Sequence, residues 1–89
     1  MAIPTFGARQ IKKCLRNLGF TILKNRGKGG HDLAQHPTRK PYQNQLPHIT
    51  IPHAVEYSSK TFRHMMIREI EAFGFTRKQV LQAFKRKVV

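Results

Sequence analysis

The sequence has very few acidic residues. Four Asp and Glu residues stand against seventeen Lys and Arg residues, which gives a formal net charge of +13. The four acids, Asp32, Glu56, Glu69 and Glu71, are scattered along the chain, which argues against a carboxylate-bound pair of magnesium ions as a catalytic centre. A chain of this charge is expected to bind a polyanion. Nucleic acid is the leading candidate, with an acidic protein or an anionic membrane surface as alternatives.

Cysteine and long apolar runs are also scarce. Cys14 is the only cysteine, so no intrachain disulfide can form, and a reducing cytoplasm is the expected location. No apolar run approaches the roughly 20 residues of a membrane-spanning helix, and residues 1–10 lack the apolar segment of a signal peptide. The chain has five histidines, but zinc sites usually include closely spaced cysteines. We therefore expect no metal ion and no cofactor.

The apolar spacing predicts one small α+β domain over residues 1–89. The expected elements are a helix over 8–18, strands over 20–26 and 31–36 joined by a glycine turn at 27–30, a proline-containing loop over 37–47, a strand within 46–52, a helix after Ser58 or Ser59, and a short last helix. Consecutive strands with short connections pair antiparallel, and helices at both ends can cover one face. The expected fold is an α-β-β-β-α sandwich of the double-stranded-RNA-binding-domain type, with a three-stranded antiparallel sheet.

Local signals predict helix ends and buried faces. Gly19 and Gly74 are expected to end two helices in the left-handed conformation, and Thr76 is expected to cap the last helix. In the third strand, Ile49 and Ile51 should share one face. The residues expected in the core at helical spacing include Cys14, Phe62, Met65, Met66, Ile70 and Phe73.

The stretch Lys28-Gly29-Gly30-His31 presents one histidine directly after a basic glycine turn. Histidine titrates near neutral pH, so it can take or give a proton where most side chains cannot. The glycines allow a close approach to the backbone and expose amide donors to a phosphate. The alternative interpretation of His31 is an exposed turn residue without a function.

Four segments occur in an order and spacing that resemble a known family. They are Asn17-Leu18-Gly19-Phe20, Lys28-Gly29-Gly30-His31, Ile49-Thr50-Ile51-Pro52-His53, and residues 62–70 followed by Phe73-Gly74-Phe75. Together they resemble the HicA-type mRNA interferases, the toxin half of a type II toxin–antitoxin pair. Gly30 stands where that family usually has serine, Asp32 is also unusual for it, and the loop over 37–47 is longer than its typical hairpin.

The resemblance implies a ribonuclease in which His31 is the catalytic residue. It also implies an acidic HicB-like antitoxin that covers the His31 site. RNA supplies its own nucleophile, the 2′-hydroxyl, so cleavage needs a base, an acid and positive charge for the developing phosphorane. Because the acidic residues are scattered, we expect cleavage of mRNA without a metal ion.

Basic side chains and glycine amides near His31 and in the long loop are the candidate RNA contacts. They are Lys24, Arg26, Lys28, Gly29, Gly30, Arg39 and Lys40. A second proton-transfer group is not evident, and His36, His48 and His53 are candidates by residue type alone. Two other functions stay open: a non-catalytic RNA-binding module of the same fold, and a toxin homologue whose activity has decayed.

Overall fold

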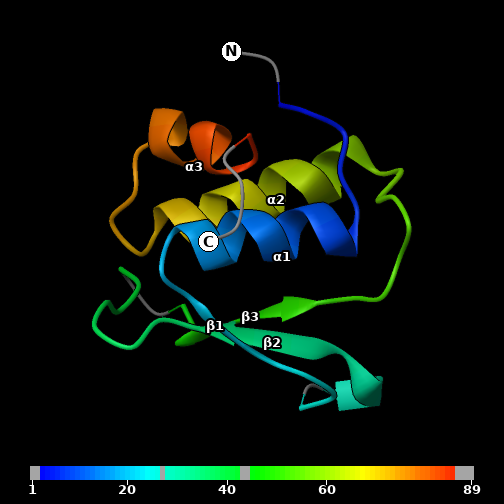
Figure 1. Ribbon diagram of the computed structural model, residues 1–89, viewed down its shortest axis with the longest axis horizontal. Helices are drawn as coiled ribbons and strands as arrows, with labels where there is room; N and C mark the ends of the chain where they lie inside the picture. The colour runs from blue at the N-terminus through cyan, green and yellow to red at the C-terminus, as the bar shows by residue number, and fades with distance from the viewer. Residues whose placement is uncertain (1–2, 27, 43–44, 86–89) are drawn as a thin grey trace.

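The computed structural model describes residues 3–26, 28–42 and 45–85. Its elements are one helix, three strands and two further helices, with a single turn of 3-10 helix before the second strand (Figure 1). They are α1 (Ala8–Asn17), β1 (Thr21–Leu23), the 3-10 turn η1 (Lys28–Gly30), β2 (Asp32–Gln35), β3 (His48–Ile51), α2 (Lys60–Glu71) and α3 (Arg77–Ala83). The predicted α-β-β-β-α order with a short C-terminal helix is confirmed.

The three strands form one antiparallel sheet in the order β1-β2-β3. The helices cover one face of this sheet (Figure 1). Side chains alternate between the two faces of a strand, and Ala34, Ile49 and Ile51 are fully buried on the helix side. Thr50, between the two isoleucines, is exposed. The prediction that Ile49 and Ile51 share the inner face is confirmed.

The helices form two layers above the sheet. α1 and α2 contact β3, and α3 packs against α1 and α2 on the side away from the sheet (Figure 1). Ile11, Cys14 and Leu15 carry the buried face of α1, as predicted for Cys14. None of the helices in the described ranges is long and apolar enough to cross a membrane.

The buried face of α2 is rotated from the predicted one. Met66 and Ile70 are buried as expected, and Ile67 joins them with no exposed surface. Met65, predicted to lie in the core, is 43% exposed. With 3.6 residues per turn, Ile67 falls on the same side of the helix as Met66 and Ile70, whereas Met65 falls beyond the edge of that face.

The helix ends follow the predicted local chemistry. Gly19 has a φ of 93° and follows α1, and the Phe20 N–H donates to the Leu15 carbonyl at 2.9 Å. These features define a Schellman ending. Ser59 caps α2 by accepting a hydrogen bond from the Phe62 N–H at 3.2 Å. The capping box at the start of α3 is also present.

The first strand is shorter than predicted. It ends at Leu23 rather than at Arg26, because Asn25 adopts a left-handed conformation with a φ of 55°. Asparagine tolerates this conformation better than most side chains do. The turn therefore begins at Lys24, and Lys28–Gly30 form η1. Gly27, also predicted to lie in this turn, is outside the described residues.

The described parts of the loop over 37–47 pack along the C-terminal half of α2. The Tyr42 N–H donates to the Ala72 carbonyl at 2.8 Å, and the Gln45 side chain donates to the Glu69 carbonyl at 3.0 Å. A loop of this length is often functional or mobile. Here its backbone and side chains satisfy carbonyls at the end of α2, which is a structural task.

The segment before α1 pairs with the segment after β3. The Ala8 N–H donates to the Ala54 carbonyl and the Tyr57 N–H donates to the Phe6 carbonyl, each at 2.9 Å. Gly7 lies between these two bonds, and a Cβ built on it would come within 1.9 Å of the Val55 carbonyl oxygen. Only glycine allows the two backbones to approach this closely.

We predict that Gly7→Ala destabilises the fold by about 1–3 kcal/mol, because the added methyl group meets backbone that cannot move aside without breaking the pairing. Urea denaturation monitored by circular dichroism measures the change. Thr5→Ala, at an exposed position two residues earlier, is the matched control and should leave the free energy of unfolding within about 0.5 kcal/mol of the wild type. Equal stability of the two variants would contradict the prediction.

Candidate active site and nucleic-acid interface

The start of β2 and the end of β3 meet at one end of the sheet. Asp32, the first residue of β2, pairs with Ile51, the last residue of β3. His31 directly precedes Asp32, and His53 follows Ile51 by two residues. The antiparallel pairing therefore brings two histidines that are distant in the sequence to the same end of the sheet.

Asp32 is a buried acid at this end of the sheet. Its residue surface is 2% exposed, its carboxylate contacts the Lys12 ammonium on α1, and it accepts a hydrogen bond from the Asn25 N–H at 2.9 Å. The hydrogen bonds from Lys12 and Asn25 hold the pKa of the Asp32 carboxyl below its usual value, against the opposing effect of burial, because both donors stabilise the ionised form. Asp32 shares the buried face of β2 with Ala34, because side chains alternate along a strand.

His31 is partly buried beside a second imidazole. Its ring centroid lies 6.3 Å from that of His53, with the two ring planes inclined at 40°. The Nδ1 atom of His31 is covered and has no hydrogen-bond partner among the described residues. Gly29 and Gly30 precede it with φ values of 73° and 82°, a conformation that glycine adopts at little cost.

His53 is held by the turn that carries His31. Its Nε2 lies 2.8 Å from the Gly30 carbonyl oxygen and 3.8 Å from an Asp32 carboxylate oxygen. A carbonyl oxygen can only accept a hydrogen bond, so Nε2 carries the proton and donates. The side chain of His53 is 56% exposed, which leaves the ring accessible to a ligand.

The Tyr57 hydroxyl supports the segment that carries His53. It donates to the Pro52 carbonyl oxygen at 2.6 Å. Burial, with a smaller contribution from the Asp32 charge, raises the pKa of Tyr57 to about 12, so the hydroxyl keeps its proton and this bond at neutral pH. The bond fixes the backbone immediately before His53.

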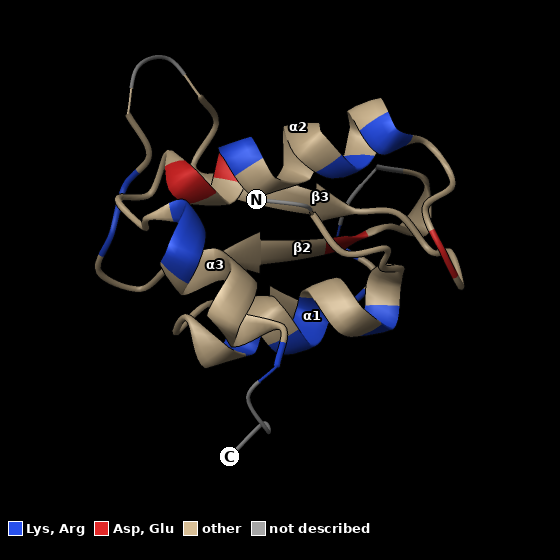
Figure 2. Cartoon of the chain, turned by 90° about the horizontal axis from the view of Figure 1, so that it is seen from above, with Lys and Arg blue, Asp and Glu red and all other residues tan. Residues whose placement is uncertain are grey.

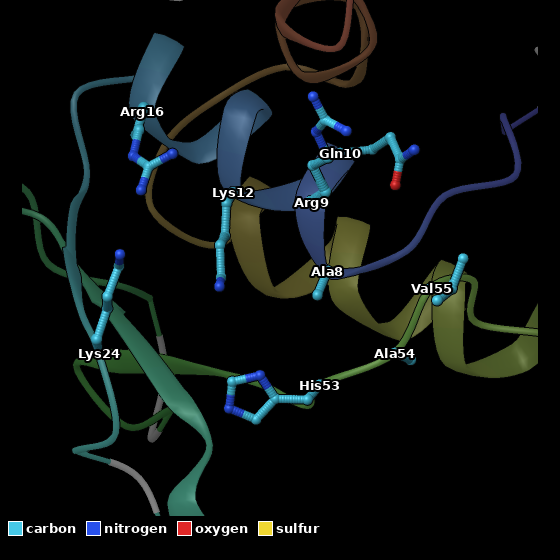
Figure 3. Close-up of a pocket in the computed structure, with 9 residues that line it drawn as sticks. All are labelled: Ala8, Arg9, Gln10, Lys12, Arg16, Lys24, His53, Ala54 and Val55. Atoms are coloured by element: carbon cyan, nitrogen blue, oxygen red, sulfur yellow. The ribbon is translucent and has the colours of Figure 1, made fainter.

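An open groove of about 810 Å³ adjoins His53 and runs along α1. Four basic side chains line it: Arg9, Lys12 and Arg16 from α1, and Lys24 from the turn after β1 (Figure 3). The three helical cations are spaced three and four residues apart, so they share one face of α1. Figure 3 shows His53 at the wall opposite α1, with Lys12 extending toward it. The remaining lining residues are Ala8, Gln10, Ala54 and Val55.

Most of the positive charge in the groove lacks an acidic neighbour. Lys12 is paired with Asp32, whereas Arg9, Arg16 and Lys24 have no ion-pair partner within residues 3–26, 28–42 and 45–85. Figure 2 shows Lys and Arg along α1 and acidic residues at few places on the same view. Unpaired cations along a groove create a positive potential that attracts a polyanion.

The structure brings together part of the predicted RNA-contact set. Lys24 lines the groove, and Arg26 is exposed in the same turn as Gly29 and Gly30. The predicted contact of the Lys28 side chain lies outside the described part of the structure. Lys12 and Arg16, whose basic helix face could equally be a solvated surface or a phosphate-facing one on the sequence alone, line the groove. Arg9, which was not singled out, lines it as well, and its spacing relative to Lys12 was the signal that could have included it.

Arg39 and Lys40 belong to the other end of the sheet, because they follow β2 whereas His31 precedes it. The Arg39 guanidinium donates to the carbonyls of Phe73 and Gly74, each at 3.3 Å, and its central carbon lies 4.2 Å from the centroid of the Phe75 ring. The structure therefore gives Arg39 a packing role at the end of α2 and separates it from the groove.

The candidates for a second proton-transfer group are separated in the same way. The His36 ring uses both nitrogens: Nδ1 accepts from the N–H groups of Thr38 and Arg39 at 3.2 and 3.1 Å, so Nε2 donates to the Leu18 carbonyl at 3.1 Å. His48 begins β3 and pairs with the last residue of β2, at the end of the sheet away from His31. His53 alone among the three lies beside His31.

Comparisons of the chain with protein-family models, with curated proteins and with solved structures find no match. Within the described ranges, no group of three or more His, Cys, Asp or Glu side chains is arranged to hold a metal ion. Cys14 is a buried thiol whose Sγ lies 3.5 Å from the Val80 carbonyl oxygen. The candidate site is therefore defined by its own geometry: two neighbouring imidazoles, a buried ion pair and a basic groove.

We predict that Asp32→Asn loses roughly 2–3 kcal/mol of stability at pH 7, because it leaves the Lys12 ammonium without its counter-charge. The folded-state pKa of Asp32 lies below the ordinary value of 3.8, so its stabilisation is present above pH 3.8 and is lost as the pH falls through the folded-state value. The difference between wild type and variant should therefore shrink at low pH.

Urea denaturation of both proteins from pH 7 down to pH 2.5 measures this. Glu56→Gln, at an exposed acid, is the control and should follow the wild type over the whole range. A wild-type advantage over Asp32→Asn that keeps the same size at every pH would show that the carboxylate charge is not what stabilises this end of the sheet.

Proposed function

We propose that this protein is an endoribonuclease that cleaves mRNA without a metal ion, with His31 as the catalytic residue. The observation that carries the proposal is a partly exposed pair of imidazoles, 6.3 Å apart between ring centroids, of which His53 lines a groove together with four basic side chains. RNA cleavage by its own 2′-hydroxyl requires proton transfer and positive charge near the phosphate. A histidine ring beside a basic groove can supply both.

The groove supports the binding half of the proposal. A phosphodiester passing along α1 meets Arg9 and Arg16, which have no acidic partner among the described residues, and reaches the histidines near Lys24. These cations release condensed counterions when they contact phosphates, which makes binding strong at low salt. They also stabilise the extra negative charge that develops on the phosphorane in the transition state.

The turn before His31 supports the catalytic half. Gly29 and Gly30 hold left-handed conformations and bring bare backbone next to the ring, where an amide can donate to a phosphate oxygen. His31 takes the proton of the 2′-hydroxyl as general base, and the attack of that oxygen on phosphorus gives a 2′,3′-cyclic phosphate. The nucleophile belongs to the substrate, so the protein needs only proton transfer and positive charge.

The resemblance to the HicA-type toxins extends this proposal to a biological role. On that basis the protein is a cytoplasmic toxin whose activity is blocked by an acidic HicB-like antitoxin bound over the His31 site. A net charge of +13 accelerates association with an acidic partner as it does with RNA.

A non-catalytic RNA-binding module is the second candidate function. The basic groove favours it, because phosphate contacts along one helix face give affinity without any chemistry. The two functions differ in what they predict for substitution of His31. A ribonuclease would lose its cleavage activity, whereas a binding module would keep its affinity for RNA.

We predict that the purified protein cleaves mRNA in excess chelator and that His31→Ala lowers the rate by about 10²–10⁴-fold, because a positioned proton-transfer group contributes that much. Gel analysis of the fragments and identification of the new ends as cyclic phosphate and 5′-hydroxyl measure the activity. His48→Ala, on the strand face opposite the core, is the matched control and should cleave like the wild type.

Loss of wild-type activity on addition of chelator would overturn the metal-independent proposal. Tight RNA binding by wild type and His31→Ala, with cleavage by neither, would assign the protein to the binding-module class. Induced expression in bacteria gives a parallel readout: the toxin proposal expects growth arrest with the wild type and growth with His31→Ala.

We predict that the double variant Arg16→Ala, Lys24→Ala weakens binding of single-stranded RNA and flattens its salt dependence. Each lost phosphate contact should reduce the slope of log Kobs against log salt by about 0.7. Fluorescence anisotropy at several salt concentrations measures both effects. Lys60→Ala, Lys78→Ala removes two exposed cations outside the groove with the same change in net charge. Equal slopes for the two double variants would mean that the groove is not the RNA-binding surface.

A further inference from the structure

Cleavage of an RNA phosphodiester needs two proton transfers at opposite sides of one phosphorus atom. The attacking 2′-oxygen loses a proton and the departing 5′-oxygen gains one. Two side chains that serve the same phosphate must each bring a ring nitrogen within roughly 3 Å of its oxygen, so the two rings must lie close enough together to contact one phosphodiester group. The ring centroids of His31 and His53 are 6.3 Å apart.

The hydrogen bonding of His53 leaves one nitrogen for the substrate. Nε2 donates to the Gly30 carbonyl oxygen at 2.8 Å, so the proton that the ring can exchange is the one on Nδ1. The Asp32 carboxylate, 3.8 Å from Nε2, gives the imidazolium form of the ring a counter-charge. Lys12 and Asn25 in turn keep that carboxylate ionised and in place.

We propose that His53 is the second proton-transfer group of the site, the general acid that protonates the 5′-oxygen of the departing nucleoside, and that Asp32 is its positioning residue. This inference rests on the proposed ribonuclease function. His31 accepts the 2′-hydroxyl proton while the 2′-oxygen forms its bond to phosphorus. The P–O5′ bond breaks as Nδ1 of His53 gives its proton to the 5′-oxygen, which leaves a 2′,3′-cyclic phosphate, a 5′-hydroxyl, a protonated His31 and a neutral His53.

The position of His53 in the lining of the groove agrees with this assignment. His53 lines the groove with Lys12 and Lys24 (Figure 3). His31 is not among the lining residues, but its ring centroid lies 6.3 Å from that of His53. A strand that lies along α1 therefore brings a phosphate to the His53 ring, and a phosphate bound at that end of the groove has the His31 ring as its next neighbour. His36 is excluded because both of its nitrogens are engaged, and His48 is excluded by its position at the other end of the sheet.

The test uses a leaving group that needs no proton. The principal cleavage site of the wild-type protein is first mapped on an RNA, and the same RNA is then made with a bridging sulfur in place of the 5′-oxygen at that site. A thiolate departs without protonation, so a missing general acid no longer matters. His53→Ala should cleave the oxygen substrate about 10²–10⁴-fold more slowly than the wild type and cleave the sulfur substrate within about 10-fold of it.

His31→Ala should be slow on both substrates, because the base is still required. Asp32→Asn should show the same selective loss as His53→Ala, but smaller. His64→Ala, a histidine on α2, is the matched control and should cleave both substrates like the wild type. Circular dichroism of each variant verifies that it is folded.

The outcomes separate this inference from the proposed function. If the wild type cleaves the RNA and His53→Ala cleaves it equally well, or is slowed equally on both substrates, His53 is not the general acid while the ribonuclease proposal stands. If the folded wild type does not cleave the RNA in the mapping step, the proposed function fails and the role of His53 fails with it. If Asp32→Asn is slowed equally on both substrates, Asp32 does not act through His53.

Discussion

The buried ion pair between Lys12 and Asp32 is the interaction on which this end of the molecule depends. It joins the middle of α1 to the first residue of β2, and through Asn25 it also anchors the turn that precedes the candidate active site. Such pairs contribute little net stability compared with apolar contacts, but they select one arrangement because the alternatives leave a charge buried alone. Asp32 is one of four acidic residues in the sequence, and its charge holds α1 against the start of β2. Arg9 and Arg16 in the neighbouring groove have no acidic partner among the described residues, so their charge is available to bind a ligand.

The pairing of β2 with β3 determines where the two histidines lie. Side chains alternate along a strand, so a slip by one residue would turn Ile49 and Ile51 outward and the residues between them inward. The cost of exposing the two isoleucines therefore holds the register in which Asp32 faces Ile51. His31 and His53, which flank that pair of residues in the sequence, acquire their proximity from the hydrophobic core rather than from any attraction between the rings.

The parts of the structure that depend on neighbouring residues were predictable from the sequence. The glycine ending of α1 and the serine cap of α2 are local hydrogen-bond patterns, and both occur where expected. The burial of Asp32 and the proximity of His53 depend on strand register and on a lysine twenty residues away, so composition and spacing could not supply them. Met65 shows the same limit within one helix, since periodicity alone does not fix which edge of an apolar face turns toward the sheet.

The two residues that depart from the HicA pattern have structural tasks in this chain. Gly30 has a φ of 82°, which a serine would adopt only with strain, and its carbonyl accepts the hydrogen bond that orients His53. The Asp32 carboxylate lies 3.8 Å from Nε2 of the same ring and is the partner of Lys12. A decayed site would be expected to lose such contacts independently of one another. The departures instead converge on one side chain, His53, which favours the role proposed for this residue over the alternative of a decayed site.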